Sequence, residues 1–341
     1  VWEWPEKLVS VPLALAAVQE EEQKGKEKKG EGSKEETKEE DSDGGKNGQE
    51  DTDDGEGQAP GDGAGDRSSP LFIGGVSART ASDITSILGK KKYVPGSSLA
   101  EGVPVEEGAR LSPGEAVTVL LAWGDVTVGS TGTLTAVGKD GRFLAFAHPF
   151  LERGAVNYPI ARAFIHSVVP SIESPFKLGS PLKIVGTVTH DRPQAIGGRL
   201  GYFTPSVSST LDFTDLDLKR KERKRFHVVP DPFMGAKLST SIFTGLIDDL
   251  WGRKGQGTAT VTLNVAGRGM NQGWTRTNMF FSDKDLAADS LKEAADLLEI
   301  IFLNPFAEVY PLGVTVAAGF SSEPKLMYIE GLSVKGESFA P

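Results

Sequence analysis

The sequence predicts a mostly β protein with two or three peripheral helices, and two observations carry this prediction. Apolar runs of strand length, separated by Gly, Pro and Asp turn residues, recur along most of the chain after residue 70. Only the stretches 77–89, 235–250 and 283–303 place apolar residues at helical spacing. The length of 341 residues allows one large domain or two ordinary ones.

The first 69 residues have a different composition. Residues 1–19 are a short apolar segment with two Trp, which we expect to belong to a structure that begins upstream or to pack as a strap on the main domain. Residues 20–69 contain 18 Asp or Glu, 8 Lys or Arg and 11 Gly, as a disordered acidic linker does. This linker carries the whole net charge of −10. Its charges follow no ligand spacing, which favours a solvated spacer over a cation- or partner-binding tail.

The folded part is expected to begin near Pro70, with a helix over 77–89 that Ser77 caps. A strand follows over 116–122, and 126–137 is expected to form one or two strands, with Gly129 and Gly132 as bulge or bend points. The pair Asp140-Gly141 predicts a hairpin turn into a strand over 142–147. Further strands are expected at 183–189, 207–218, 258–266, 308–319 and 325–334.

Two longer helices interrupt the strands. The segment 235–250 carries apolar residues at every fourth position, and the segment 283–303 begins with a capping box of Ser282 and Asp285. The dipeptide Asn304-Pro305 ends the second helix.

Composition excludes several classes of function. Because the chain has no Cys, it has no zinc–thiolate site, disulfide or Cys nucleophile. No two His stand at helical spacing beside an acid, and no phosphate loop or dinucleotide fingerprint occurs, so no metal or cofactor is expected. No net basic field attracts nucleic acid, and no run of 18 apolar residues predicts a membrane-spanning helix. The sequence gives no oligomeric state.

His148 is the first candidate for chemistry. It follows a strand directly, in the run FLAFAHPF (143–150), and Pro149 then ends the strand. A catalytic base is often held at such a strand end. A structural His bonded to a backbone carbonyl would show the same pattern, so both interpretations remain open.

Ser180 and Asp191 are weaker candidates. Ser180 lies in the run FKLGSP (176–181) and could act as a nucleophile with His148, although the flexible Gly-x-Ser-Gly turn is missing and only 32 positions separate the two residues. A turn residue before Pro181 is the favoured interpretation. Asp191 could orient a His, or it could pair with Arg192 or form a turn. His166 and His227 have no convincing partners, and His190 is as readily exposed as functional.

The basic run KRKERKR (219–225) is a candidate anion patch. It lies between strand-like segments, and a solvated hairpin tip explains it more simply.

The stretch 124–198 resembles the SpoIVB-type serine peptidase domain, above all the larger bacterial envelope proteins that carry it. The segments LAFAHPF (144–150), PSIESPFKLGSP (170–181) and GTVTHDRPQAIGG (186–198) carry the resemblance, which extends more weakly over about 70–331. It implies a chymotrypsin-like β framework, an extracytoplasmic location and a peptide or protein substrate.

The resemblance also implies site residues. His148 falls on the family's catalytic His, whereas Ser180 falls where other members carry non-nucleophilic residues. The envelope members have a Gly-Met-Ser-Gly-Ser-Pro segment before the His region, and this sequence lacks it. We therefore expect residues 70–335 to form a serine endopeptidase domain with His148 as general base and a nucleophile upstream of Val1. Residues 336–341 would begin a linker or a further domain. The alternative is a catalytically inactive β scaffold that binds peptides or envelope partners.

Overall fold

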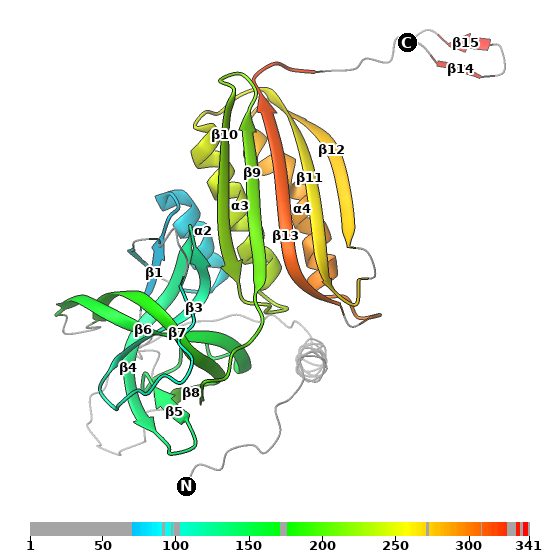
Figure 1. The fold of residues 1–341 in the computed structure, drawn as a ribbon. Coiled ribbons are helices and arrows are strands. Elements are labelled where there is room, and N and C mark those ends of the chain that lie inside the picture. The colour runs from blue at the N-terminus through cyan, green and yellow to red at the C-terminus, as the bar shows by residue number, and fades with distance from the viewer. Residues whose placement is uncertain are drawn as a thin grey trace, which may run out of the picture. The chain divides into compact units, whose positions relative to one another are not determined.

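The computed structural model describes residues 70–341, except for 91–92, 97, 99–102, 171–175, 271–272, 308, 326–331, 335–336 and 340–341. The expected segments 1–19 and 20–69 lie outside these described residues. The described part is mostly β, with fifteen strands and three helices, which confirms the predicted fold class. Two layers of structure, a closed barrel and an open sheet with helices, make up this fold (Figure 1).

The first layer is a closed barrel of six antiparallel strands in the order β3–β4–β5–β8–β7–β6, which returns to β3. Its strands are β3 (Ala116–Gly124), β4 (Thr127–Val137), β5 (Arg142–Ala145), β6 (Gly154–Val169), β7 (Phe176–Arg192) and β8 (Ala195–Leu200). Strands β3, β4 and β5 follow one another, and β6 returns beside β3, which is a Greek key.

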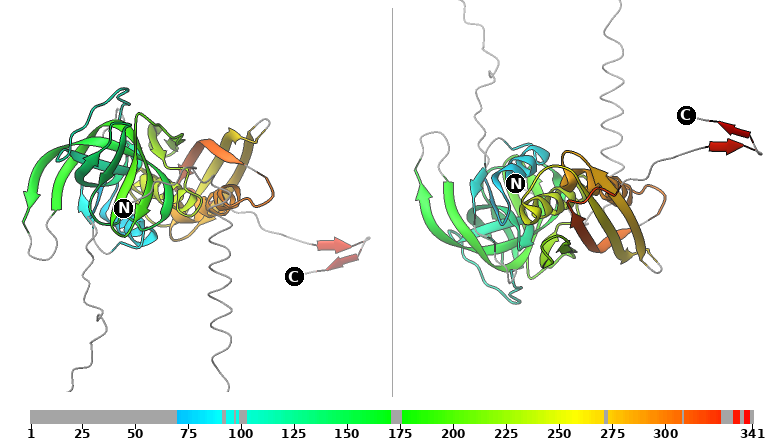
Figure 2. Two further views of the ribbon diagram at one scale, coloured as in Figure 1. Left: turned by 90° about the horizontal axis from the view of Figure 1, so that it is seen from below. Right: turned by 90° about the horizontal axis from the view of Figure 1, so that it is seen from above.

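The long strands β6 and β7 each contribute to two parts of the structure. Near Gly154 and Asp191 they belong to the barrel wall, whereas among the described residues their other halves form ladders only with each other and extend away from the barrel as a two-stranded arm (Figure 2). Phe164 and Val168 of this arm are more than half exposed. The arm and the barrel therefore place residues of one hairpin in two separate environments.

The second layer is an open sheet of five strands in the order β12–β11–β13–β9–β10. Its strands are β9 (Val207–Asp215), β10 (Arg220–Val228), β11 (Gly257–Arg268), β12 (Trp274–Ser282) and β13 (Tyr310–Ser321). The helices α3 (Gly235–Trp251) and α4 (Leu286–Phe302) cover one face (Figure 1). Alternate residues, such as Leu211 and Phe213, are buried under these helices, and the residues between them line the uncovered face.

Strand pairing and the N-terminal unit both connect the barrel with the open sheet. Strand β10 pairs with β3 only at Phe226–Val228, opposite Ala122–Gly124. The N-terminal unit of β1 (Leu71–Gly74), α2 (Ala78–Ile87) and β2 (Tyr93–Pro95) pairs through β1 with β4 of the barrel and packs through α2 on α3. The α2–α3 contact is close, because a Cβ at Gly245 would lie 2.3 Å from the Thr80 side chain.

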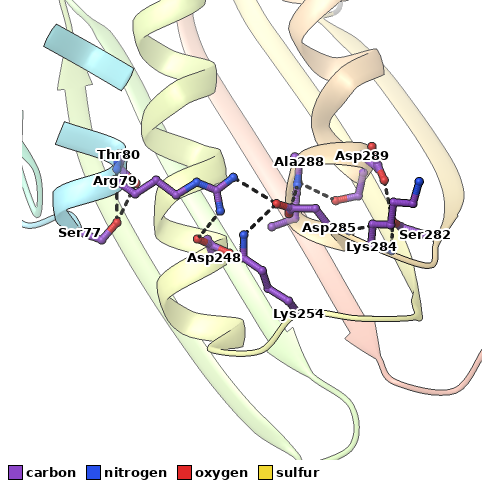
Figure 3. A network of polar contacts seen from close by, with 12 residues as sticks. Ser77, Arg79, Thr80, Asp248, Lys254, Ser282, Lys284, Asp285, Ala288 and Asp289 are labelled. Carbon is purple, nitrogen blue, oxygen red and sulfur yellow. Dashed lines mark hydrogen bonds and ion pairs between the residues drawn. The ribbon is translucent and has the colours of Figure 1, made fainter. Parts of the chain in front are cut away.

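A polar network fixes the same region. Arg79 of α2 lies 3.1 Å from Asp285, the N-cap of α4, and 3.5 Å from Asp248 of α3 (Figure 3). Lys254 lies 3.3 Å from Asp285. The three helices line a groove of about 340 Å³, whose charged side chains include Arg79, Asp248 and Asp285. Because exposed ion pairs contribute little stability, this network adds little to the free energy of folding.

The structure confirms the three predicted helices and most of the predicted strands. Ser77 caps α2 as expected, and the hairpin turn follows β4. Asp285 rather than Ser282 is the N-cap of α4, since its side chain accepts from the Ala288 N–H at 3.2 Å. Only Leu332–Val334 of the predicted strand over 325–334 is described as a strand, and it pairs with β15 (Glu337–Phe339).

One prediction about a particular segment is wrong. The basic run 219–225 is not a hairpin tip, because all but its first residue lies in β10. Gly132 of β4 is closely packed, because a Cβ there would lie 2.4 Å from the Phe146 ring. Close packing therefore requires a glycine at this position.

Candidate active site at the His148 loop

His148 lies in the loop between β5 and β6, and we call residues 146–153 the His148 loop. Three of its non-glycine residues have a left-handed backbone: Phe146 at φ 74°, Ala147 at φ 57° and Glu152 at φ 59°. Each such residue costs about 1–3 kcal/mol. Strain of this kind persists only where surrounding contacts hold it, and it is concentrated at functional sites.

Asp191 at the end of β7 supplies the main contacts that hold the loop. Its side chain is 1% exposed. One carboxylate oxygen accepts the Phe150 N–H at 2.8 Å, and the other accepts the Leu151 N–H at 2.7 Å. Lys90 adds a bond from Nζ to the Phe150 carbonyl at 2.5 Å. Asp191, the candidate orienting residue, therefore binds the backbone that immediately follows His148 and Pro149.

Aromatic packing holds the loop from its other side. The Phe146 ring lies against Gly132 of β4, and its centroid is 5.4 Å from that of the His148 ring. Phe150 packs edge-on against both Phe146 and Tyr158, with centroid distances of 6.4 Å and 6.2 Å. Such contacts fix ring positions more strongly than the burial of area alone.

The imidazole of His148 has a defined tautomer. Its Nδ1 lies 2.7 Å from the carbonyl oxygen of Pro149, and a carbonyl only accepts hydrogen bonds. Nδ1 therefore carries the proton, and Nε2 of the neutral ring is the nitrogen that can accept one. The side chain is half-buried, so the loop presents a base at the surface of the barrel.

A second polar contact connects this site with the other layer. The Tyr158 hydroxyl of β6 donates to Asp231 at 2.9 Å, and the second oxygen of Asp231 accepts the N–H groups of Phe233 and Met234 just before α3. Burial raises the pKa of Tyr158 well above its usual value, and the nearby Asp231 carboxylate raises that pKa further. Tyr158 is therefore a neutral hydrogen-bond donor at physiological pH.

Ser180 occupies a different place. It lies in the arm of β6 and β7, where its Oγ is 2.8 Å from Nε2 of His166. It precedes Asp191 by eleven residues on the same strand, roughly 36 Å of extended chain at the usual rise per residue. The structure thus places Ser180 with His166, at the far end of the hairpin from the His148 loop.

The Ser180–His166 contact supplies only part of what serine catalysis requires. An oxyanion hole needs backbone N–H groups that converge beside the nucleophile. Ser180 lies within a strand, and the next residue is Pro181, which has no N–H. This setting favours a cross-strand hydrogen bond over a catalytic pair.

The expectation that His166 and His227 lack partners is wrong. His166 contacts Ser180, as described above. His227 stacks on Trp123 with a centroid distance of 5.3 Å, and its Nδ1 lies 3.1 Å from the Ser206 hydroxyl. Burial lowers the pKa of His227, and burial together with Arg192 lowers the pKa of His190.

Sequence reasoning missed the Tyr158–Asp231 bond, the Lys90 contact and the Ser180–His166 pair. Each joins residues that are at least fourteen positions apart, and no local motif marks such a contact. Among the described residues, no cluster of His, Asp and Glu is arranged to hold a metal ion. No helix in the described part is long and apolar enough to cross a membrane.

Comparisons with known proteins add no assignment. No family model, curated protein or solved structure matches the chain. Its function therefore has to be inferred from the geometry of its own residues.

Proposed function

We propose that this chain supplies the general base, His148, of a serine-type peptide hydrolase of the SpoIVB kind. The hydrogen bond from His148 Nδ1 to the Pro149 carbonyl carries the proposal, because it makes Nε2 the proton acceptor. The strained backbone of the His148 loop supports it, since such strain is common at catalytic sites. The family resemblance of the segment 144–150 supports the same role and an extracytoplasmic location.

In this mechanism Nε2 takes the proton of a serine hydroxyl as its Oγ attacks the peptide carbonyl carbon. The imidazolium then gives that proton to the amine nitrogen as the C–N bond breaks, which leaves an acyl-enzyme. A water molecule, deprotonated by the same nitrogen, then attacks the acyl carbon, which releases the carboxylic acid product and regenerates the serine. The Nδ1–H bond to the carbonyl holds the ring in place and stabilises its positive charge.

The other residues have supporting roles in this proposal. Asp191 is a positioning residue, because its bonds are to the loop backbone at Phe150 and Leu151. Ser180 is not the nucleophile in this proposal, because it contacts His166 in the arm.

A fluorophosphonate probe tests the proposal on the protein isolated from its source organism. We expect covalent labelling of one serine, located by mass spectrometry, and loss of labelling in His148→Gln. The matched controls His166→Gln and Ser180→Ala, both in the arm, should label normally. Labelling that survives His148→Gln would remove this base, and labelling lost in Ser180→Ala would move the site to the arm.

The second candidate function is a peptide-binding β scaffold without catalysis. The specific observation in its favour is a stretch of strand β10 whose outer edge pairs with no described strand. This function predicts no covalent label but saturable binding of an extended peptide. Turnover of a peptide that depends on His148 would contradict it.

A further inference from the structure

Strand β10 has an edge that is only partly used. On one side it pairs with β9 along its whole length, from Arg220 to Val228. On the other side it pairs with β3 only at Phe226–Val228, because β3 ends at Gly124 and the chain turns into β4. Residues 220–224, which we call the open edge, have no strand partner on that side among the described residues.

The direction of the backbone groups at the open edge follows from the neighbouring residues. Arg225 points its N–H and C=O toward the β3 side, where the Asp125 carboxylate accepts the N–H at 2.7 Å and the Asp125 N–H donates to the C=O at 2.8 Å. Residues two apart in a strand point their backbone groups to the same side. Lys221 and Arg223 therefore present two N–H and two C=O groups to the open edge.

The side chains around this edge are strongly basic. Lys219, Arg220, Lys221, Arg223, Lys224 and Arg225 carry six positive charges, and Glu222 is the one acid among them. Lys221, Arg223 and Arg225 lie on the uncovered face of the sheet, since Phe226 and Val228 point to the helices. Arg223 pairs with Asp212 on the same face. Except for the half-buried Lys224, these residues are exposed.

Lysines on an edge strand are also a common means of preventing aggregation. Two features go beyond that use. Six of the seven residues from Lys219 to Arg225 are basic, which is far more than one or two lysines, although the chain outside its acidic linker has no net charge. The contact of Asp125 with the Arg225 N–H also shows that a carboxylate can take the position of the next strand at this edge.

We propose that the open edge of β10 binds an acidic extended peptide segment of a partner protein as an added strand. The peptide runs antiparallel to β10, in line with β3, and forms backbone hydrogen bonds with Lys221 and Arg223. Acidic residues occupy every second position of the peptide, because its side chains opposite Lys221 and Arg223 lie on the uncovered, basic face of the sheet. The residues between them face Glu222, which disfavours acids there. This inference does not rest on the role of His148.

Fluorescence anisotropy of the intact chain with a labelled peptide that alternates glutamate with threonine tests the proposal. We expect saturable binding that weakens with salt. The double variant Lys221→Glu/Arg223→Glu should weaken binding by about twentyfold, because an exposed ion pair contributes up to roughly a factor of five in affinity. The matched control Lys183→Glu/Lys292→Glu reverses two exposed charges on β7 and α4 and should bind normally.

Two modified probes distinguish an added strand from simple charge attraction. N-methylation of the peptide nitrogens that face β10 should weaken binding about three- to tenfold per methyl group, whereas methylation at the alternate positions should not. Equal effects at both sets of positions would overturn the strand geometry. A single-stranded oligonucleotide that binds more tightly than the peptide, with the same dependence on Lys221, would overturn the choice of a peptide partner. Binding that both double variants reduce equally would overturn the open edge as the site.

Discussion

The bonds of Asp191 to the His148 loop give the sharpest stability prediction. Asp191→Asn keeps the shape of the side chain but replaces one accepting oxygen with an NH₂ group. One of the two short bonds, to the N–H of Phe150 at 2.8 Å or of Leu151 at 2.7 Å, then becomes a contact between two donors. A hydrogen bond to a charged group contributes about 1.5–3 kcal/mol, so unfolding should become easier by about 2–3 kcal/mol. Asp191→Ala removes both bonds and should cost about 4–5 kcal/mol.

Urea denaturation measures these changes, with an unchanged m-value to show that the unfolding reaction is the same. The matched control Asp283→Asn alters an exposed side chain and should change the free energy of unfolding by less than about 0.5 kcal/mol. Because the loop that carries His148 loosens, the variant should also show a changed rate of imidazole modification by diethyl pyrocarbonate. A loss below about 1 kcal/mol for Asp191→Asn, with unchanged His148 reactivity, would refute the role of Asp191 in holding the loop.

Three further predictions concern the same barrel and its junction with the sheet. Gly132→Ala places a Cβ 2.4 Å from the Phe146 ring, so the free energy of unfolding in urea should fall by about 1–3 kcal/mol. The rate of His148 modification should change as well. An unchanged free energy of unfolding would show that the ring can move freely. Tyr158→Phe removes the hydrogen bond to Asp231 and should lower the free energy of unfolding by about 1.5–3 kcal/mol. An unchanged urea midpoint would mean that this bond adds no stability. Burial lowers the pKa of His227 in the folded state, so the unfolded state binds more protons below about pH 6.5 and stability falls as the pH falls. His227→Gln should therefore flatten the loss of stability between about pH 7 and 5, and an unchanged pH profile would contradict this.

Local sequence signals found the helices and the strands that bury a regular apolar face. They did not find β6, β8, β10 and β12 as such. Strand β6 contains Pro159, which normally argues against an interior strand. Strand β10 begins with charged residues, because that half lies at an edge where neither face is fully covered. These strands form because their neighbours in the sheet provide hydrogen-bond partners, and no pattern within the segments records this.

The residues of the candidate site also differ in whether the local sequence reveals their role. His148 could be identified because a strand, a His and a Pro follow one another directly in the chain. The role of Asp191 could not, since it depends on bonds to a loop 40 residues earlier. The Gly-Ser-Pro run made Ser180 a candidate nucleophile although its spacing from His148 argued against that role, and the pairing of β6 with β7 places Ser180 opposite Phe164 and beside His166.

The sequence by itself determined the β character of the folded part, its three helices, the acidic composition of residues 20–69 and the absence of Cys chemistry. These properties depend on composition and on spacing within a few residues. Only the tertiary structure decided that six strands close into a barrel, that Asp191 holds the His148 loop and that β10 has an open edge. Each of these depends on which distant segments pair, and pairing is set by the burial of many side chains together rather than by any single segment.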